Sequence, residues 1–263
     1  MRNDFDLDRA PAASFPYAEP RTIGSLDECY FYHSMDVPGH GTIKGEWDLR
    51  GSVDDYLGHF DFAGKRVLDV GAASGILSFH IERQGAEVVS FDLSEDFDWD
   101  IVPFAENDNA ATRSERRGHL RKINNGYWLC HQAFQSNARM VNGVVYDIPA
   151  AIGNVDVAVF GSILLHLRDP FLALENAARL TTEAIIVSDL SPYGKFASRF
   201  KRNPRFMPRS SKPKGITDGW FRLPPLLVQE YLGILGFRNI TLTWHDFQYG
   251  DRTRPIYTII ARR

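Results

Sequence analysis

The rhythm of apolar and polar positions changes near residue 65. Residues 1–20 follow no helical or strand period, and residues 21–60 mix glycine, histidine, aromatic and charged residues irregularly. One short helix is expected there, around residues 53–59. Beyond this point short apolar runs alternate with amphipathic segments. We therefore predict a flexible arm at 1–20, a lid and acceptor-pocket segment at 21–60, and a folded domain at 61–263.

The apolar runs of the domain predict seven strands, at residues 65–71, 87–91, 139–146, 155–160, 184–187, 239–244 and 256–261. Helices are expected at 74–84, 120–134, from Asp169 onward, and 224–235. Such alternation favours an α/β fold, with a mostly parallel sheet covered by helices on both faces. Two strands follow the last helix, joined by a connection containing Gly250 and Asp251, so we expect the last strand to be antiparallel.

A glycine loop follows the first strand, in the stretch VLDVGAASG that ends at Gly75. Gly71 permits a sharp turn, and the helix that follows offers free N–H groups to a ligand. Asp92 ends the next strand, where a carboxylate can accept hydrogen bonds from both ribose hydroxyls. The G-x-G-x-x-G dinucleotide fingerprint and the P-loop are both absent. The loop thus favours a phosphate-free nucleoside; the alternative is an ordinary tight turn beside a surface aspartate.

The stretch VLDVGAASG, followed by FDLSE, resembles the first two motifs of class I S-adenosylmethionine-dependent methyltransferases. The resemblance covers roughly residues 60–262 and implies a Rossmann-like seven-stranded sheet with S-adenosylmethionine as cofactor. The family's usual loop is G-x-G-x-G, and its central position is Ala73 here. By resemblance, the cofactor contacts are Gly71, Ala72, Ala73 and Gly75 around the methionine and ribose, Asp92 at the ribose, Leu93 and Asp147 at the adenine, and Gly161 beside the sulfonium.

The segment YFYHSMDVPGHGTIKGEWDLRG precedes this core. It is similar to a bacterial subgroup that includes actinobacterial sugar O-methyltransferases. It is distantly similar to tRNA wobble-uridine carboxymethyltransferases, which also carry a Trp-Asp segment ahead of the core. This similarity implies either a saccharide or a tRNA as the methyl acceptor.

A hydroxyl acceptor needs a base, and His166 is our first candidate because it follows the fourth strand, at the edge of the sheet where ligands bind. The alternative is a histidine packed among leucines at a helix start. Glu46 could orient the hydroxyl or His166, Trp47 could stack on a sugar or cover the cofactor, and Arg50 could pair with the methionine carboxylate. Further polar and aromatic side chains of an acceptor pocket are Tyr32, His33, Asp36 and His40. The last three could also bind a metal such as Mg²⁺, although no helix supports their spacing.

Composition narrows the class of protein. The formal charge is −3, with 30 basic and 33 acidic residues, which argues against a dedicated polyanion binder. Two cysteines and no apolar leader predict a cytoplasmic protein, and the longest apolar stretch covers nine residues, against the ~20 that span a bilayer. The expected partners are a small hydroxylated substrate and a second copy of the chain, with no membrane.

The charges are nevertheless segregated. Residues 92–108 hold seven acids and no base, and residues 195–214 hold eight bases and no acid. A basic mobile loop at 195–214 could hold RNA phosphates or an anionic small substrate, or it could be a solvated loop. The leading prediction is an S-adenosylmethionine-dependent O-methyltransferase acting on a small polyhydroxylated acceptor such as a saccharide. The alternatives are a tRNA-modifying methyl- or carboxymethyltransferase and a non-catalytic cofactor-binding subunit.

Overall fold

The computed structural model describes residues 17–211 and 218–263. Most of the predicted arm at 1–20, together with Lys212 and Lys214 of the basic segment, lies outside the described residues. Within the described chain, no helix combines the length and the apolar character needed to cross a membrane.

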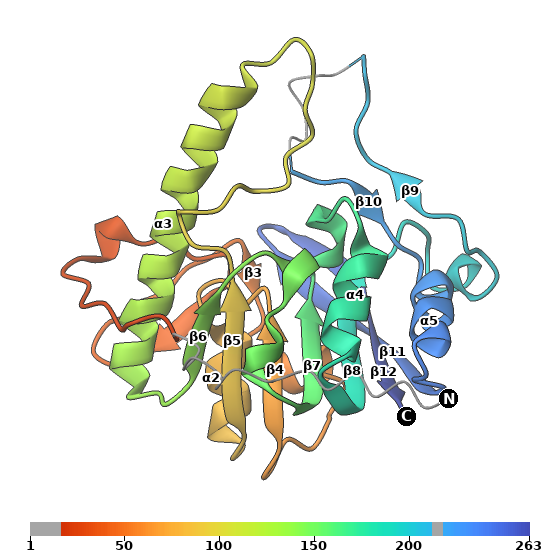
Figure 1. Ribbon diagram of the computed structural model, residues 1–263, viewed down its shortest axis with the longest axis horizontal. Coiled ribbons are helices and arrows are strands. Elements are labelled where there is room, and N and C mark those ends of the chain that lie inside the picture. The colour runs from red at the N-terminus through yellow and green to blue at the C-terminus, as the bar shows by residue number, and fades with distance from the viewer. Residues whose placement is uncertain (1–16, 212–217) are drawn as a thin grey trace, which may run out of the picture.

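One large sheet organises the structure (Figure 1). Its spatial order is β3 (Trp47–Asp48), β11 (Asn239–Tyr249), β12 (Arg252–Arg262), β8 (Thr181–Leu190), β7 (Val155–Gly161), β4 (Arg66–Val70), β5 (Glu87–Asp92) and β6 (Arg139–Asn142). The strands from β8 to β6 pair in parallel, whereas β12 runs antiparallel to both β8 and β11. The predicted α/β class and the antiparallel last strand are confirmed. The eighth strand, β3, comes from the N-terminal segment and pairs with the end of β11.

Helices cover both faces of the sheet, because successive strand residues point to opposite sides. Val67 of β4 packs on the face of α2 (Ile76–Arg83) and α3 (Asn109–Phe134). Its neighbour Leu68 packs on the face of α4 (Pro170–Ala178) and α5 (Pro225–Ile234). Both side chains are fully buried. Two apolar cores therefore hold the sheet between them.

Short elements connect this framework. They are η1 (Leu26–Glu28), β1 (Met35–Val37), β2 (Gly41–Ile43), α1 (Val53–Tyr56), η2 (Val145–Asp147), η3 (Ala150–Ile152), η4 (Leu164–His166), η5 (Ala197–Arg199), β9 (Arg205–Phe206) and β10 (Phe221–Arg222). β9 pairs with β10, so the described part of the basic segment has local structure. Four predicted strands differ in length by more than two residues: 139–146 ends at Asn142 because the chain enters η2, whereas 184–187 extends to 181–190, 239–244 to 239–249 and 256–261 to 252–262.

Helix α3 begins at Asn109, eleven residues before the predicted start of 120–134. The first half of α3 is polar on every side, so its sequence carries no apolar period. Asp108 caps the helix by accepting the N–H groups of Ala110 and Ala111, at 3.1 and 3.0 Å. Arg113 and Arg117 then pair with Asp98 of the acidic stretch. Capping and ion pairs, rather than burial, explain this part of the helix.

The N-terminal segment runs from α3 to the far edge of the sheet. The Tyr30 N–H donates to the Lys122 carbonyl of α3 at 2.9 Å, and the Gly250 N–H donates to the Glu46 carbonyl at 2.9 Å. In Figure 1 this red-to-orange segment lies beside α3 and continues to β3. Residues 17–60 thus contact both ends of the molecule that flank the carboxyl edge of the sheet.

The cap of α3 can be tested by Asp108→Ala. We expect a loss of about 1 kcal/mol in the free energy of unfolding, because the N–H groups of Ala110 and Ala111 lose their acceptor. Urea denaturation followed by circular dichroism measures this difference. Asp108→Asn keeps an acceptor oxygen and should retain most of the stability; an equal loss in both variants would contradict the capping role.

Candidate active site

A cavity of about 540 Å³ lies at the carboxyl ends of β4, β5 and β7. Its floor is formed by the loops that follow these strands, beginning at Gly71, Asp92 and Gly161. The N-terminal segment and α3 supply the facing wall. In open parallel sheets this edge is where ligands bind, and the volume falls within the ~300–1,000 Å³ of small-molecule sites.

The loop after β4 is held in a conformation that brings its backbone close to the cavity. Gly71 has φ +81°, and a Cβ atom there would lie 2.7 Å from Ile163 Cδ1. Ala73, the central position of the loop, has φ +49°, a left-handed conformation that costs a residue with a side chain roughly 1–2 kcal/mol. Gly161 has a similar constraint, since its Cβ would lie 2.7 Å from Leu77 Cδ1. The lack of a side chain at Gly71 and Gly161 therefore lets the loops after β4 and β7 pack closely against Ile163 and Leu77 at the cavity floor.

Asp92 lies at the end of β5 and lines the cavity. Its Oδ2 accepts the Ala73 N–H at 2.6 Å, and its Oδ1 accepts the Leu93 N–H at 2.7 Å. Burial raises the pKa of Asp92 to about 6, while these two N–H groups act in the opposite direction. At neutral pH the group is a carboxylate with a lone pair on each oxygen left for ribose hydroxyls.

His166 ends η4 and also lines the cavity. Its Nδ1 lies 2.9 Å from the backbone carbonyl oxygen of Asp218. A carbonyl only accepts, so Nδ1 carries the proton and, in the neutral ring, Nε2 holds the lone pair. The ring packs edge-on against Trp99, with centroids 6.2 Å apart. These contacts fix both the orientation and the tautomer of the imidazole.

Glu46 faces the cavity with its carboxylate held by two tyrosines. Tyr30 donates its hydroxyl to Oε1, and Tyr249 donates to Oε2 at 3.2 Å. Burial, and then the Glu46 carboxylate, raise the pKa of Tyr30 above its ordinary value. Trp47 lines the same wall and packs on Tyr249, with ring centroids 4.6 Å apart. The hydrogen bonds of the Glu46 carboxylate are with these two tyrosines and not with His166.

Tyr32 and His33 also line the cavity. The Tyr32 hydroxyl lies 3.1 Å from His119 Nε2. Burial lowers the pKa of His33 to about 4, so this histidine is neutral at physiological pH. The structure thus brings together ten predicted site residues: Tyr32, His33, Glu46, Trp47, Gly71, Ala73, Asp92, Leu93, Gly161 and His166.

Six other predicted site residues do not line the cavity: Asp36, His40, Arg50, Ala72, Gly75 and Asp147. Gly75 instead begins α2 with φ +88°, where a Cβ would lie 2.3 Å from the Phe79 ring. Asp147 is exposed in η2, so it does not face the nucleoside position as expected; Tyr146 beside it does line the cavity. Ala72, within the glycine loop, is buried.

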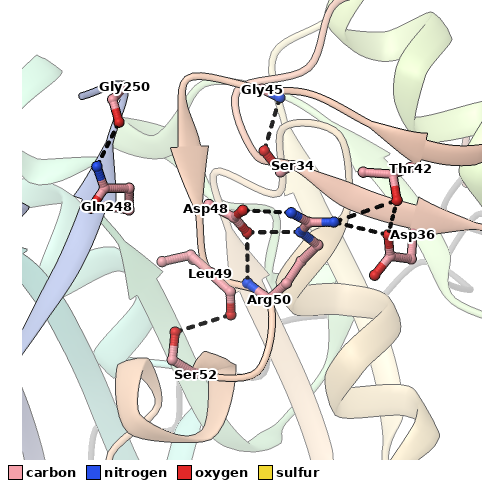
Figure 2. A network of polar contacts seen from close by, with 10 residues as sticks. All are labelled: Ser34, Asp36, Thr42, Gly45, Asp48, Leu49, Arg50, Ser52, Gln248 and Gly250. Atoms are coloured by element: carbon pink, nitrogen blue, oxygen red, sulfur yellow. Dashed lines mark hydrogen bonds and ion pairs between the residues drawn. The ribbon is translucent and has the colours of Figure 1, made fainter. Parts of the chain in front are cut away.

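Arg50 belongs to a separate surface network (Figure 2). Its guanidinium pairs with Asp48, at 2.7 Å from Nη2 to Oδ2, and with Asp36, at 3.1 Å from Nη1 to Oδ1. Asp36 also accepts the Thr42 hydroxyl at 2.6 Å. The expectation that Arg50 pairs with the cofactor carboxylate is therefore corrected: its charge is already matched outside the cavity.

The described residues contain no group of three or more histidine, cysteine, aspartate or glutamate side chains positioned to hold a metal ion. His33 lines the cavity, whereas Asp36 and His40 are exposed at the surface. Asp36 pairs with Arg50, as described above. The three residues considered as ligands in the sequence thus lie in different environments.

Several residues that line the cavity were not predicted from the sequence. Arg116 and His119 are three positions apart on α3, and both flank Trp99, as cation and as stacked ring. Both residues precede the predicted helix start at 120. Only the observed start at Asn109 places them one helical turn apart on the same face of α3. Ser162, with φ +53°, follows Gly161 and shares a hydrogen bond with the Tyr56 hydroxyl at 2.8 Å. Strain of this kind is found at functional sites.

A doubly wound sheet with an acid at the end of its second parallel strand is typical of nucleoside-binding α/β domains. Residues 48–217 match the sequence profile described as "Methyltransferase domain". The chain therefore belongs to this family, and the domain is an S-adenosylmethionine-dependent methyltransferase. The residues present fit the cofactor, because the carboxylate of Asp92 lines the cavity at the strand ends and can accept hydrogen bonds from a ribose.

Solved structures with low sequence identity to this chain share its fold. The N-terminal domain of EvdMO1, crystallised in the presence of SAH and D-fucose, matches with a TM-score of 0.56 at 18% identity, over 90% of this chain and 93% of that chain. Magnesium protoporphyrin IX methyltransferase (ChlM) from Synechocystis PCC 6803 with bound SAH gives 0.50 at 14% identity, over 80% of each chain. A ubiquinone biosynthesis O-methyltransferase of Azoarcus sp. (strain BH72) is 55% identical over 38 residues, 14% of this chain and 16% of that protein.

Asp92→Asn should weaken binding of S-adenosylhomocysteine by roughly 10- to 100-fold, since a charged acceptor of hydrogen bonds is lost. Isothermal titration calorimetry measures the dissociation constant. Asp98→Asn is a matched control, because Asp98 also lines the cavity but is paired with Arg113 and Arg117. Equal affinities of Asp92→Asn and the unaltered protein would remove the ribose assignment.

The buried Asp69 on β4 should make stability depend on pH. Burial raises the pKa of Asp69 to about 7, while hydrogen bonding by Ser78, whose hydroxyl lies 2.6 Å from Oδ2, acts in the opposite direction. Oδ1 is buried without a hydrogen-bond partner. The unfolded pKa is ~3.9, so the folded state binds more protons between about pH 4 and 7, and stability falls as the pH rises through this range.

Asp69→Asn removes this titration. We expect the difference in the free energy of unfolding between pH 5 and pH 8, measured by urea denaturation, to be smaller than in the unaltered protein. Glu106→Gln, at an exposed position, should leave the difference unchanged. An undiminished difference in Asp69→Asn would show that other groups cause the pH dependence.

Proposed function

We propose that this protein transfers a methyl group from S-adenosylmethionine to a hydroxyl of a small polyhydroxylated acceptor of the saccharide class. The observation that carries the proposal is His166, whose Nδ1 is bound to the Asp218 carbonyl at 2.9 Å while its other nitrogen is the basic one. A base with a fixed tautomer at the strand ends suits a hydroxyl acceptor, which must lose a proton, better than an amine acceptor.

The cofactor supplies an electrophilic methyl group, and the protein must align the acceptor oxygen with it. His166 Nε2 would take the hydroxyl proton as the oxygen forms its bond to carbon. The resulting imidazolium keeps its Nδ1–H bond to the carbonyl, which stabilises the positive charge. Trp99 packs against the ring and keeps it from rotating away.

The remaining wall supports a small polar acceptor. Tyr30 and Tyr249 hold the carboxylate of Glu46, and Trp47 offers an aromatic face beside it. Carboxylates and hydroxyls can bind sugar hydroxyls, while an indole ring can pack on the apolar face of a sugar ring. The EvdMO1 domain was crystallised in the presence of D-fucose, but at 18% identity its similarity to this chain is one of fold alone.

A second candidate is a tRNA acceptor, and the basic segment favours it. Lys195, Arg199, Lys201 and Arg202 are exposed there beside the exposed rings of Phe196 and Phe200. Basic side chains interleaved with aromatic rings can bind single-stranded RNA. However, Lys195 lies 3.5 Å from Asp246, and Arg202 lies 3.8 Å from Glu230. Those pairs reduce the positive charge offered to phosphates, and for this reason we favour the small acceptor.

His166→Ala should lower methyl transfer by roughly 10²- to 10⁴-fold and leave the affinity for S-adenosylhomocysteine within about two-fold, because the ring acts on the acceptor. The assay follows labelled methyl transfer from S-adenosylmethionine to monosaccharides, catechols and total tRNA. His40→Ala, at an exposed position outside the cavity, is the control. A normal rate in His166→Ala would remove the base, and transfer to tRNA alone would favour the second candidate.

A further inference from the structure

Among the described residues, the acidic side chains of the cavity all have partners, whereas two of its arginines have no acidic partner. Five acids line it, and each of them has a partner: Glu46 the tyrosines, Asp92 two backbone N–H groups, Asp98 and Asp100 arginines, and Asp218 the guanidinium of Arg116 at 3.0 Å. Three arginines line the cavity as well, Arg116, Arg222 and Arg254. Of these, only Arg116 has an acidic partner within 4 Å among the described residues.

Arg222 and Arg254 come from different elements and act on the same space. Arg222 ends β10, and Arg254 is the third residue of β12. Both are half-buried. Burial lowers the pKa of Arg222, and the positive charges of Arg205 and Arg254 lower it further. The fold thus places two like charges at one cavity.

The pairing of β9 with β10 adds a third positive charge. Arg205 lies directly opposite Arg222 in this ladder. Like charges at directly opposed positions of a sheet destabilise the pairing. Asp189, at the end of β8, compensates only in part, because burial raises its pKa to about 7 and one of its carboxylate oxygens lacks a hydrogen-bond partner. A bound anion would relieve the repulsion between the arginines.

Arg222 lies close in the fold to the segment that carries the proposed base. Two residues before Arg222, the Trp220 N–H donates to the Leu165 carbonyl at 2.8 Å, beside His166. Figure 1 places β9 and β10 near α4 and α5, away from β5, whose end carries Asp92. In the sheet, β8, β7 and β4 lie between β12, which carries Arg254, and β5. Both arginines are therefore at a different part of the cavity from Asp92. An anion bound by the arginines would lie closer to the segment of the proposed base than to the ribose site.

From this geometry we propose that Arg222 and Arg254 form an anion subsite, and that the methyl acceptor carries a carboxylate or phosphate group bound there. The inference rests on the proposed function and specifies its substrate class: an acidic hydroxylated molecule, such as a uronic acid or a sugar phosphate. Arginine is suited to both anions, since its planar guanidinium donates two parallel hydrogen bonds.

The direct test uses inorganic phosphate as the probe. Phosphate is titrated by calorimetry into the protein saturated with S-adenosylhomocysteine, at constant ionic strength. The double variant Arg222→Gln with Arg254→Gln should bind phosphate at least ten-fold more weakly, because charge-assisted hydrogen bonds are lost. The control is Arg199→Gln with Arg252→Gln, which removes the same charge at exposed positions outside the cavity.

Methyl transfer to D-glucuronate and D-glucose gives a second readout. We expect the unaltered protein to prefer the acid by ten-fold or more in kcat/KM, and the cavity double variant to lose this preference through a raised KM. Equal phosphate binding in the cavity variant and the control would overturn the subsite. Transfer that does not distinguish acid from neutral sugar would overturn the substrate class.

Three further outcomes separate this inference from other assignments. Loss of S-adenosylhomocysteine binding in the cavity variant would assign the arginines to the cofactor's own carboxylate and overturn the subsite. Displacement of bound phosphate by tRNA, together with methyl transfer to tRNA alone, would overturn the proposal of a small acidic acceptor. Intact phosphate binding with no transfer to any hydroxyl would instead count against the proposed function, since the calorimetric result does not depend on catalysis.

Discussion

The hydrogen bond from the Ala73 N–H to the Asp92 carboxylate connects the two strand ends on which the site depends. It ties the loop after β4 to the end of β5, whose parallel pairing already places Val70 beside Phe91. The left-handed conformation of Ala73 is stabilised by this bond, which offsets part of its steric cost. The same carboxylate is thus both a structural acceptor and the group available to a ribose, so the loop is shaped before any ligand binds.

The rest of the cavity is added to this framework by segments outside the parallel sheet. The Ser74 hydroxyl donates to the Tyr30 carbonyl at 3.1 Å, which anchors the N-terminal segment on the glycine loop itself. Helix α3 brings His119 and Arg116 against Trp99, and Arg116 pairs with Asp218, whose carbonyl orients His166. The orientation of the proposed base therefore depends on residues more than 100 positions apart in the chain.

The features that the sequence predicted are those with a local cause. Gly71, Ala73 and Asp92 follow buried strands and could be placed because parallel strands end at one edge of the sheet. Arg50 could not be placed, because its pairing with Asp48 and Asp36 depends on how β1 and β3 fold. The early start of α3, and with it the placement of Arg116 and His119, could not be predicted either. The first half of α3 is stabilised by an aspartate cap and ion pairs instead of burial, so its sequence has no apolar period. Arg222 and Arg254 line one cavity only because of the tertiary structure.

Strand β3 links inactivation of the protein to its self-association. β11 is the outermost long strand of the sheet, and β3 pairs only with Gln248 and Tyr249 at its end. The segment that carries Glu46 and Trp47 into the cavity therefore also blocks lateral growth of the sheet at that point. An unpaired strand edge is a template for pairing with another chain. Detachment of this segment would open the cavity and expose more of the β11 edge together, so inactivation and self-association would share one structural origin.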